Sequence, residues 1–378
     1  MSYSEIPDHR AMIFDQIRNQ AYLKGIQETV KPGDIVLDLG AGLGVLGLLA
    51  LQQGAGKVYM VEPADSVLEV ARLVAKHNNL DDRLVVVPKT IEEANIPEQV
   101  DCILSVFTGN FMLSEDLLPS LIYARGKYLK PNGVMLPSRG IMQLAPVVAQ
   151  EFYSNSIDGW ASILDLEYSL VRSYAVNSTY DVAPTNFDCT LLAEPTSIFE
   201  LDFVRAENAD CRSTNQVNIC KSGTCHGLLG WFNAQVGSDW ISTSPVGEQM
   251  HWSQVFLPLD KPINVEPGDV IQVDLNRPEN GNWTWSVKHN KETQRQSTFL
   301  GRPQNPEKLS RRMDTYMPKL NKQGEALRQI LDLFDGTHKS LDIARKIQSQ
   351  YPDFQSSERS TLDTIKYLID SYASDDLM

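Results

Sequence analysis

Between residues 25 and about 146, short apolar and β-branched runs alternate with stretches of helical periodicity. This alternation predicts a parallel sheet covered by helices. Each apolar run ends at a polar or glycine-rich turn, so we expect a ligand crevice at the carboxyl ends of the strands. The runs expected to form strands are 34–39, 57–62, 84–87, 100–105 and 133–137.

From about 143 to 299, apolar and polar residues alternate, with frequent Gly, Pro, Asn and Asp turns, which is typical of antiparallel β structure. The stretch 151–171 interrupts this pattern. It is apolar on one face, and we expect a helical arm that packs on another subunit. After Pro303 and Pro306 the composition becomes charged and helix-favouring.

Three helices are expected in this last part, at 325–334, 340–351 and 357–372, with a turn at Asp335-Gly336 between the first two. The chain of 378 residues is long enough for two or three domains. We therefore expect an α/β domain over 1–142, an antiparallel β domain over 143–303 and a small helical domain over 304–378.

Composition excludes several classes of protein. No apolar run reaches the roughly 18 residues that cross a bilayer, and the first ten residues lack a basic-then-apolar secretion pattern. We expect a cytoplasmic protein whose five cysteines are free thiols. A net charge of −14 argues against nucleic acid and favours a neutral or cationic substrate, although an acidic surface also aids solubility by itself.

A glycine-rich turn indicates the cofactor site. Gly40, Gly42 and Gly44 follow a predicted strand that carries Asp38, and glycine lets backbone turn tightly and approach a ligand. About twenty residues later Glu62 ends the next strand, where a carboxylate can accept both ribose hydroxyls. The spacing G-x-G-x-G differs from the dinucleotide pattern, but a dinucleotide enzyme and a turn used only for packing stay open as alternatives.

Over nearly all of 12–290 the sequence is similar to the protein arginine methyltransferases. Residues 13–22 resemble the family helix that caps the cofactor, which implies that Arg18 pairs with the methionine carboxylate and that Tyr22 borders the substrate pocket. The stretch 90–93 resembles the segment that meets the adenine, which implies contacts from Ile91 and Glu92. The resemblance implies S-adenosyl-L-methionine as cofactor, a class I Rossmann-like methyltransferase domain and a β-barrel with a dimerisation arm.

Met250, His251 and Trp252 resemble the family's Thr-His-Trp loop, with methionine in place of threonine. In the family this loop lines the acceptor pocket and its histidine faces an aspartate of the N-terminal helix. The resemblance implies that His251 and Asp15 form a charged pair that tethers this helix to the barrel and accepts protons.

The acceptor loop departs from the family. The family holds the substrate guanidinium between two glutamates, and here Glu115 matches the second while Val106 replaces the first. Valine forfeits a charge-assisted hydrogen bond of about 1.5–3 kcal/mol. We therefore expect a smaller acceptor, such as a side-chain amide, an imidazole or an amine, with Glu115 as the base. Asn110 supplies part of the missing contact or is only a turn residue beside Gly109.

The helical segment from 324 to 347 looks like the small winged-helix domains with which peptide-modifying enzymes bind the leader of a ribosomally made precursor. A packing appendage is the alternative. Cys220, Cys225 and His226 lack zinc-finger spacing and suggest a turn, so no metal is expected.

Together these patterns predict a homodimeric methyltransferase that uses S-adenosyl-L-methionine and acts on a side-chain nitrogen of a protein or peptide, with a non-arginine acceptor favoured. Arginine methylation, methylation of a small molecule and a low-activity scaffold that binds peptides stay open.

Overall fold

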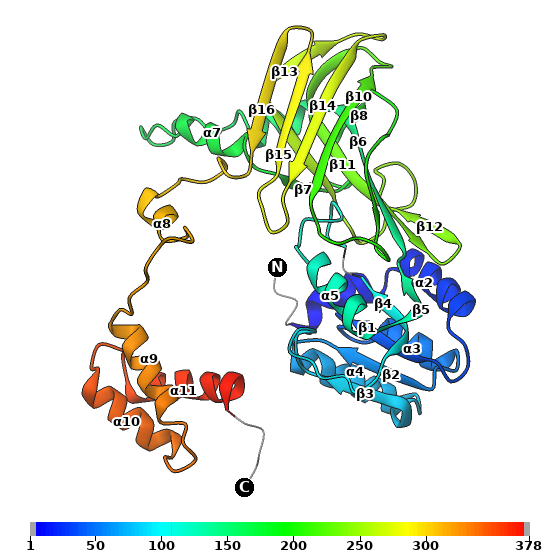
Figure 1. The fold of residues 1–378 in the computed structure, drawn as a ribbon. Helices are drawn as coiled ribbons and strands as arrows, with labels where there is room; N and C mark the ends of the chain where they lie inside the picture. The colour runs from blue at the N-terminus through cyan, green and yellow to red at the C-terminus, as the bar shows by residue number, and fades with distance from the viewer. Residues whose placement is uncertain (1–4, 107, 374–378) are drawn as a thin grey trace. The chain divides into compact units, whose positions relative to one another are not determined.

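The computed structural model describes residues 5–106 and 108–373. The chain separates into two compact units, Met1–Pro303 and Gln304–Met378 (Figure 1). The first unit contains a parallel sheet with its helices and a set of antiparallel strands. No helix among the described residues is long and apolar enough to cross a membrane.

The parallel sheet has the strand order β3-β2-β1-β4-β5. All neighbouring strands in it are parallel, as predicted. Its strands are β1 (Ile35–Leu39), β2 (Lys57–Val61), β3 (Leu84–Val87), β4 (Val100–Ser105) and β5 (Leu129–Leu136). The strand order reverses between β1 and β4, and ligands bind outside the carboxyl ends of strands at such a switch point. The loops after β1 and β4 are therefore where the site is expected.

Helices connect these strands and precede them. The N-terminal elements are η1 (Ile6–His9), α1 (Arg10–Ile13) and α2 (Gln16–Thr29), followed along the chain by α3 (Val45–Gln52), α4 (Asp65–His77), η2 (Asp81–Arg83) and α5 (Leu118–Tyr128). Helix α2 contacts the antiparallel part through its exposed side. Lys24 pairs with Asp239 at 2.7 Å, and Glu28 accepts hydrogen bonds from the backbone N–H and hydroxyl of Ser238.

The antiparallel strands form two sheets. One has the order β7-β13-β11-β6-β8, with β12 added on β11 and β9 on β6, and the other has the order β10-β14-β15-β16. The first contains β6 (Arg139–Val148), β7 (Tyr180–Val182), β8 (Thr190–Leu191), β9 (Thr196–Asp202), β11 (Gly223–Val236), β12 (Asp239–Ser242) and β13 (Gln254–Val265). The second contains β10 (Cys211–Asn218), β14 (Val270–Arg277), β15 (Thr284–His289) and β16 (Glu292–Ser297). This part begins at Arg139, four residues before the predicted start at 143.

The predicted helical arm is only partly helical. Helix α6 (Gln150–Ser156) ends early, and η3 (Ser169–Val171) and α7 (Arg172–Ala175) follow an irregular segment. Leu164 and Asp165 have φ of 50° and 64°, in the left-handed region, and they form a tight turn that no continuous helix allows. The expectation of one helix over 151–171 was wrong. The apolar side chains are nevertheless exposed, with Leu164 at 90% and Leu170 at 66%.

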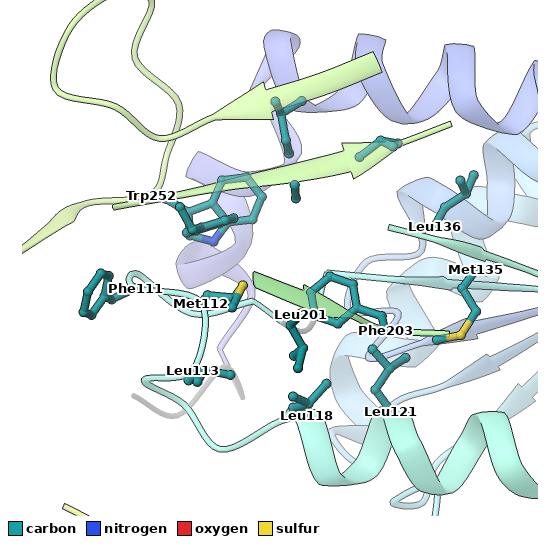
Figure 2. Packing of buried hydrophobic residues seen from close by; sticks show 14 of the residues in the cluster. Phe111, Met112, Leu113, Leu118, Leu121, Met135, Leu136, Leu201, Phe203 and Trp252 are labelled. Carbon is teal, nitrogen blue, oxygen red and sulfur yellow. The ribbon is translucent and has the colours of Figure 1, made fainter. Parts of the chain in front are cut away.

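One hydrophobic core runs through both parts of the first unit. Figure 2 shows Phe111 and Met112 of the loop after β4, Leu118 and Leu121 of α5, and Phe203 just beyond β9 in the same packing region. All are 3% exposed or less. Because this loop belongs to the core shared by the parallel sheet and the antiparallel strands, its position is fixed by packing.

The second unit consists of α8 (Pro306–Ser310), α9 (Lys322–Asp332), α10 (Ser340–Gln350) and α11 (Glu358–Tyr372). Helices α9, α10 and α11 confirm the three predicted helices and share a separate core that includes Ile330, Ile347 and Ile365. The described residues 304–373 contain no strand, so the expected wing is not found among them.

Candidate functional site

The turn after β1 adopts a backbone that requires glycine. Gly40, Gly42 and Gly44 have φ of 68°, 53° and 80°, a region that other residues rarely adopt. The backbone N–H groups of Gly40 and Ala41 donate to the carbonyl of Val61, which fixes the turn at the end of β2. The predicted strand, glycine turn and helix start are thereby found in the predicted order.

Two carboxylates hold this turn. Asp38 on β1 accepts a hydrogen bond from the N–H of Gly47 at 2.8 Å, in the first turn of α3. Burial raises the pKa of Asp38 to about 7. Glu62 accepts from the N–H of Gly42 at 3.2 Å and of Ala64 at 3.1 Å. Asp38 therefore orders the start of α3, whereas the Glu62 carboxylate lies directly beside the glycine turn.

The N-terminal elements cover the glycine turn. A side-chain carbon at Gly42 would lie 3.0 Å from the His9 ring, so the buried His9 packs on this turn. Arg18 on α2 is 3% exposed, and its Nε and Nη2 donate to Oδ1 of Asn19. Burial lowers the pKa of Arg18, and the charge of Asp38 opposes this effect. Sequence reasoning did not identify His9, because no pattern distinguishes it from any other histidine near a chain end.

Asp15 and His251 meet as expected, but they are not a doubly charged pair. Oδ2 of Asp15 accepts from Nδ1 of His251 at 2.7 Å and from its backbone N–H at 2.9 Å. Burial lowers the pKa of His251 below 6.5, although Asp15 opposes this. At neutral pH a neutral imidazole therefore donates from Nδ1, and its Nε2 is the basic nitrogen. Burial raises the pKa of Asp15, but the hydrogen bonds from His251 and Arg18 lower this pKa by more than burial raises it. The pKa of Asp15 is therefore below its usual value.

The loop after β4 is attached to the barrel at two points. The indole Nε1 of Trp252 donates to the carbonyl of Thr108 at 2.8 Å. The backbone N–H of Ser253 donates to Oδ1 of Asn110 at 2.9 Å. Asn110 therefore uses its carbonyl oxygen to fix the loop, which the sequence left open between a turn and a substrate contact.

Glu115 lies across the backbone of Gly109. A side-chain carbon at Gly109 would lie 2.7 Å from Cγ of Glu115, so glycine provides the space for this carboxylate. Glu115 is exposed, and its charge acts on the His251 ring. It lines a cavity of about 540 Å³ together with Asn110. The acidic group of the predicted acceptor site thus lies at an open cavity.

The other residues predicted for the substrate pocket are more buried than Glu115. Tyr22 is 1% exposed, and its hydroxyl donates to the carbonyl of Ser105 at 2.7 Å. Burial raises its pKa well above the usual range. Trp252 is 7% exposed, while Val106 and Met250 pack against the core. These four residues pack around the loop after β4, and their place in the acceptor pocket stays a prediction.

The predicted adenine-contacting stretch lies next to α5. Ile91 is 2% exposed and belongs to the core. Glu92 is exposed, and its Oε1 accepts from the hydroxyl of Ser120 at 2.6 Å. Glu92 is therefore accessible to a ligand amine, whereas Ile91 presents a buried apolar side chain.

The residues present fit a nucleoside cofactor with a carboxylate at its other end. The glycine turn permits close backbone approach, the Glu62 carboxylate lies beside it, and the buried Arg18 guanidinium is suited to a carboxylate. With the switch-point topology, these features define an S-adenosylmethionine-dependent methyltransferase. They do not identify the group that accepts the methyl.

Comparison with known proteins identifies the family. The model for the arginine methyltransferase oligomerization subdomain matches residues 138–292, and that for ribosomal protein L11 methyltransferase matches 19–158. The chain is 34% identical over 288 residues to protein arginine N-methyltransferase 6 of Xenopus tropicalis, covering 72% of this chain and 84% of the relative. The Danio rerio protein of that name is also 34% identical, over 73% of this chain and 82% of its own. The chain belongs to the protein arginine methyltransferase family.

Solved structures agree with the fold. The Trypanosoma brucei PRMT1 enzyme-prozyme heterotetrameric complex with AdoHcy has a chain that matches with a TM-score of 0.71 at 22% identity, covering 79% of this chain and 99% of that chain. Protein arginine methyltransferase 10 of Arabidopsis thaliana matches with a TM-score of 0.65 at 27% identity, over 78% and 99%. These matches confirm the predicted combination of a Rossmann-like domain with a β-barrel.

Proposed function

We propose that the enzyme methylates an arginine side chain of a protein or peptide, with the guanidinium bound against Glu115. The observation that carries this proposal is the position of the Glu115 carboxylate, which lines an open cavity on a loop that Trp252 and Ser253 hold by hydrogen bonds. The curated relatives are named arginine methyltransferases, and this favours arginine over the non-arginine acceptor that the sequence alone suggested.

The bound cofactor would supply a methyl group on a positively charged sulfur, leaving S-adenosylhomocysteine. The side chains of this protein hold the acceptor nitrogen and remove its proton. Glu115 accepts an N–H and orients the nitrogen lone pair. Glu115 or Nε2 of His251 would take the proton that the acceptor nitrogen loses when it receives the methyl group. Asp15 holds that histidine in the required tautomer.

Val106 favours a second candidate, a neutral side-chain amide. A guanidinium offers five donors, and a pocket with one glutamate satisfies fewer of them than a pocket with two. The loss is about 1.5–3 kcal/mol, which weakens guanidinium binding without abolishing it. An amide needs only one carboxylate partner for its N–H, but its delocalised lone pair makes it a poorer nucleophile.

Transfer of radiolabelled methyl from the cofactor to matched peptides separates these candidates. The peptides are identical except for arginine, asparagine, glutamine, histidine or lysine at one position, and the free amino acids serve as controls. Label on the arginine peptide supports the proposal. Label on an amide or imidazole peptide with none on arginine supports the second candidate, and label confined to free amino acids contradicts both.

We also propose roles for the cofactor-binding residues. Arg18 binds the amino-acid carboxylate, Glu62 the ribose hydroxyls and Glu92 the adenine amine, while Gly40, Gly42 and Gly44 admit the ligand to the backbone. The buried side chains of Asp38 and Ile91 hold the residues that contact the cofactor in place. Glu62→Gln should weaken cofactor binding in calorimetry by about tenfold, because each ribose hydroxyl would lose a charged partner. Unchanged affinity would remove Glu62 from the cofactor site.

For the assembly we propose a homodimer formed through the arm at residues 151–171. The match to an oligomerization subdomain over 138–292 supports this proposal. So does the row of exposed apolar side chains on the arm, since patches of this kind mark protein interfaces. Its members are Trp160, Ile163, Leu164, Leu166, Tyr168 and Leu170.

For the second unit we propose a role in binding a segment of the substrate chain outside the acceptor cavity, such as a leader of a ribosomally made peptide. Its separate core and two exposed tyrosines on α11, Tyr367 at 69% and Tyr372 at 67%, support this proposal. Tyr367→Ala should raise KM for a long precursor and leave KM for a short acceptor peptide unchanged. Equal effects on both substrates would contradict the proposed role.

A further inference from the structure

The cavity beside Glu115 has a second polar wall that the proposed chemistry does not use. Arg277, the last residue of β14, lines the same cavity of about 540 Å³. The wall also includes Asp116, which directly follows Glu115 in the chain, and Trp283 from the turn after β14. The group that holds the acceptor and this second wall are therefore joined through consecutive residues.

Arg277 is buried, and its hydrogen-bonding groups are only partly used. It is 3% exposed, and its Nη2 donates to Oδ1 of Asp116 at 2.5 Å. Its Cζ lies 5.3 Å from the centre of the Trp283 ring. Within the described part of the chain, Nε and Nη1 are buried and have no hydrogen-bond partner. Buried donors without an acceptor are destabilising, so their presence at a cavity wall calls for a ligand that completes them.

The charges around the cavity indicate the chemistry of that ligand. Glu115, Asp116 and Asp181 line the cavity together with Arg277 and Arg302. Asp116 already pairs with Arg277, and a substrate carboxylate placed there would lie near further carboxylates of the same sign. A neutral carbonyl oxygen accepts N–H donors without adding charge. It is therefore the ligand that fits this wall.

We propose that Arg277, held by Asp116, is a subsite that binds a neutral carbonyl oxygen of the substrate chain next to the residue that Glu115 holds. Arginine suits this position because one Nη group pairs with Asp116 while Nε and the other Nη stay available as donors. A peptide places backbone carbonyls at intervals of about 3.3–3.6 Å per residue, so an extended chain can present one to Arg277 while the acceptor is at Glu115. The proposal rests on the proposed methylation of a protein or peptide.

Two substitutions at Arg277 separate binding from folding. Arg277→Lys keeps the pairing with Asp116 but lacks the Nε and second Nη donors. It should raise KM for an acceptor peptide about tenfold or more, since a hydrogen bond to a charged donor is lost, and leave kcat and cofactor affinity unchanged. Arg277→Met removes the buried unpaired donors and should raise KM similarly without lowering the melting temperature. Arg212→Lys, at an exposed position on β10, is the matched control and should change neither quantity.

Backbone substitution in the substrate identifies the carbonyl. Acceptor peptides in which one amide at a time is replaced by a trans-alkene should show one position at which wild-type KM rises. Arg277→Met should be insensitive to that replacement, because the partner is already gone. Equal sensitivity of the wild type and the variant at every position would overturn the proposal, as would a lower melting temperature of Arg277→Met with unchanged KM. If replacement of a side-chain amide, rather than a backbone amide, shows the coupling, the carbonyl belongs to a side chain.

Failure of the proposed acceptor has a different outcome. If arginine peptides take no label but another peptide does, the acceptor assignment fails, and the same alkene series in that peptide still tests Arg277. If only free amino acids are methylated, with no peptide accepting label, the subsite proposal is overturned, because such a substrate has no chain carbonyl beyond the acceptor residue.

Discussion

At the scale of single residues, Glu115 is the group whose removal best tests the chemistry. It is exposed, and two hydrogen bonds from Trp252 and Ser253 to other residues attach the loop that carries it to the barrel. Glu115→Gln keeps the size of the side chain and removes the negative charge that holds the acceptor and accepts its proton. We expect kcat to fall about 10²–10⁴-fold, with cofactor affinity nearly unchanged, as measured by radiolabel transfer and calorimetry.

A glutamate in a barrel turn provides the control for that substitution. Glu207→Gln changes the same side chain at an exposed position outside the cavity and should leave kcat unchanged. Normal turnover by Glu115→Gln would exclude Glu115 as the acceptor group. Loss of cofactor binding together with turnover would point to a disturbed fold instead.

A substitution at Val106 is the complementary experiment, because a glutamate there restores the carboxylate that the family pattern contains. Val106 is partly buried against the core near the end of β4. Val106→Glu should raise kcat/KM for an arginine peptide about tenfold through one more charge-assisted hydrogen bond. The rate on an amide peptide should not rise. Val106→Gln is the uncharged control, and no gain for Val106→Glu on arginine would show that the pocket differs from the family pattern at more than this position.

The sequence predicted residues whose roles depend on their neighbours in the chain, and it missed residues whose roles depend on contacts with distant segments. Gly40, Gly42 and Gly44 follow from a pattern within one turn, and their positive φ values agree with it. Asn110 accepts a hydrogen bond from a backbone N–H that lies 143 positions later in the chain. Arg277 has unpaired donors because of how the loop after β4 packs against β14. Contacts of this kind arise only when distant elements pack, so no local pattern indicates them.

At the scale of elements, the link between α2 and the loop containing His251 should respond to pH. Burial lowers the pKa of His251 below 6.5, so below that pH the unfolded chain binds a proton that the folded chain resists. Asp15, with a pKa below 3.8, loses its stabilising hydrogen bonds only in stronger acid. The contribution of this link to the free energy of unfolding should therefore be largest above pH 6.5 and fall as the pH decreases.

His251→Gln tests this expectation. The difference in free energy of unfolding between wild type and variant, measured by urea denaturation from pH 5 to 8, should shrink as the pH falls. His289→Gln is the control, because it removes another histidine that contacts an aspartate, Asp269, at 3.3 Å on the barrel. A wild-type advantage over His251→Gln that grows in acid would contradict the assigned neutral imidazole.

Element prediction succeeded where periodicity was regular and failed where a turn interrupted it. The runs at 84–87 and 100–105 match β3 and β4 residue for residue, because each is a short, mostly apolar run between polar turns. The arm has enough apolar residues for a helix, but the left-handed Leu164 and Asp165 reverse the chain. Spacing of apolar residues describes which side chains need covering, and it does not determine whether a helix or an irregular segment presents them.

At the scale of the whole molecule, the arm should determine the oligomeric state. Leu164 is 90% exposed, so Leu164→Asp removes no contact of the monomer core and places a charge in the proposed interface. Sedimentation velocity should show a dimer for the wild type and a monomer for this variant, or a dissociation constant raised at least tenfold. Leu73→Asp, at a leucine 52% exposed on α4, is the matched control and should stay dimeric. A dimer unaffected by Leu164→Asp would place the interface elsewhere, and a wild type that is monomeric at every concentration would contradict the dimer itself.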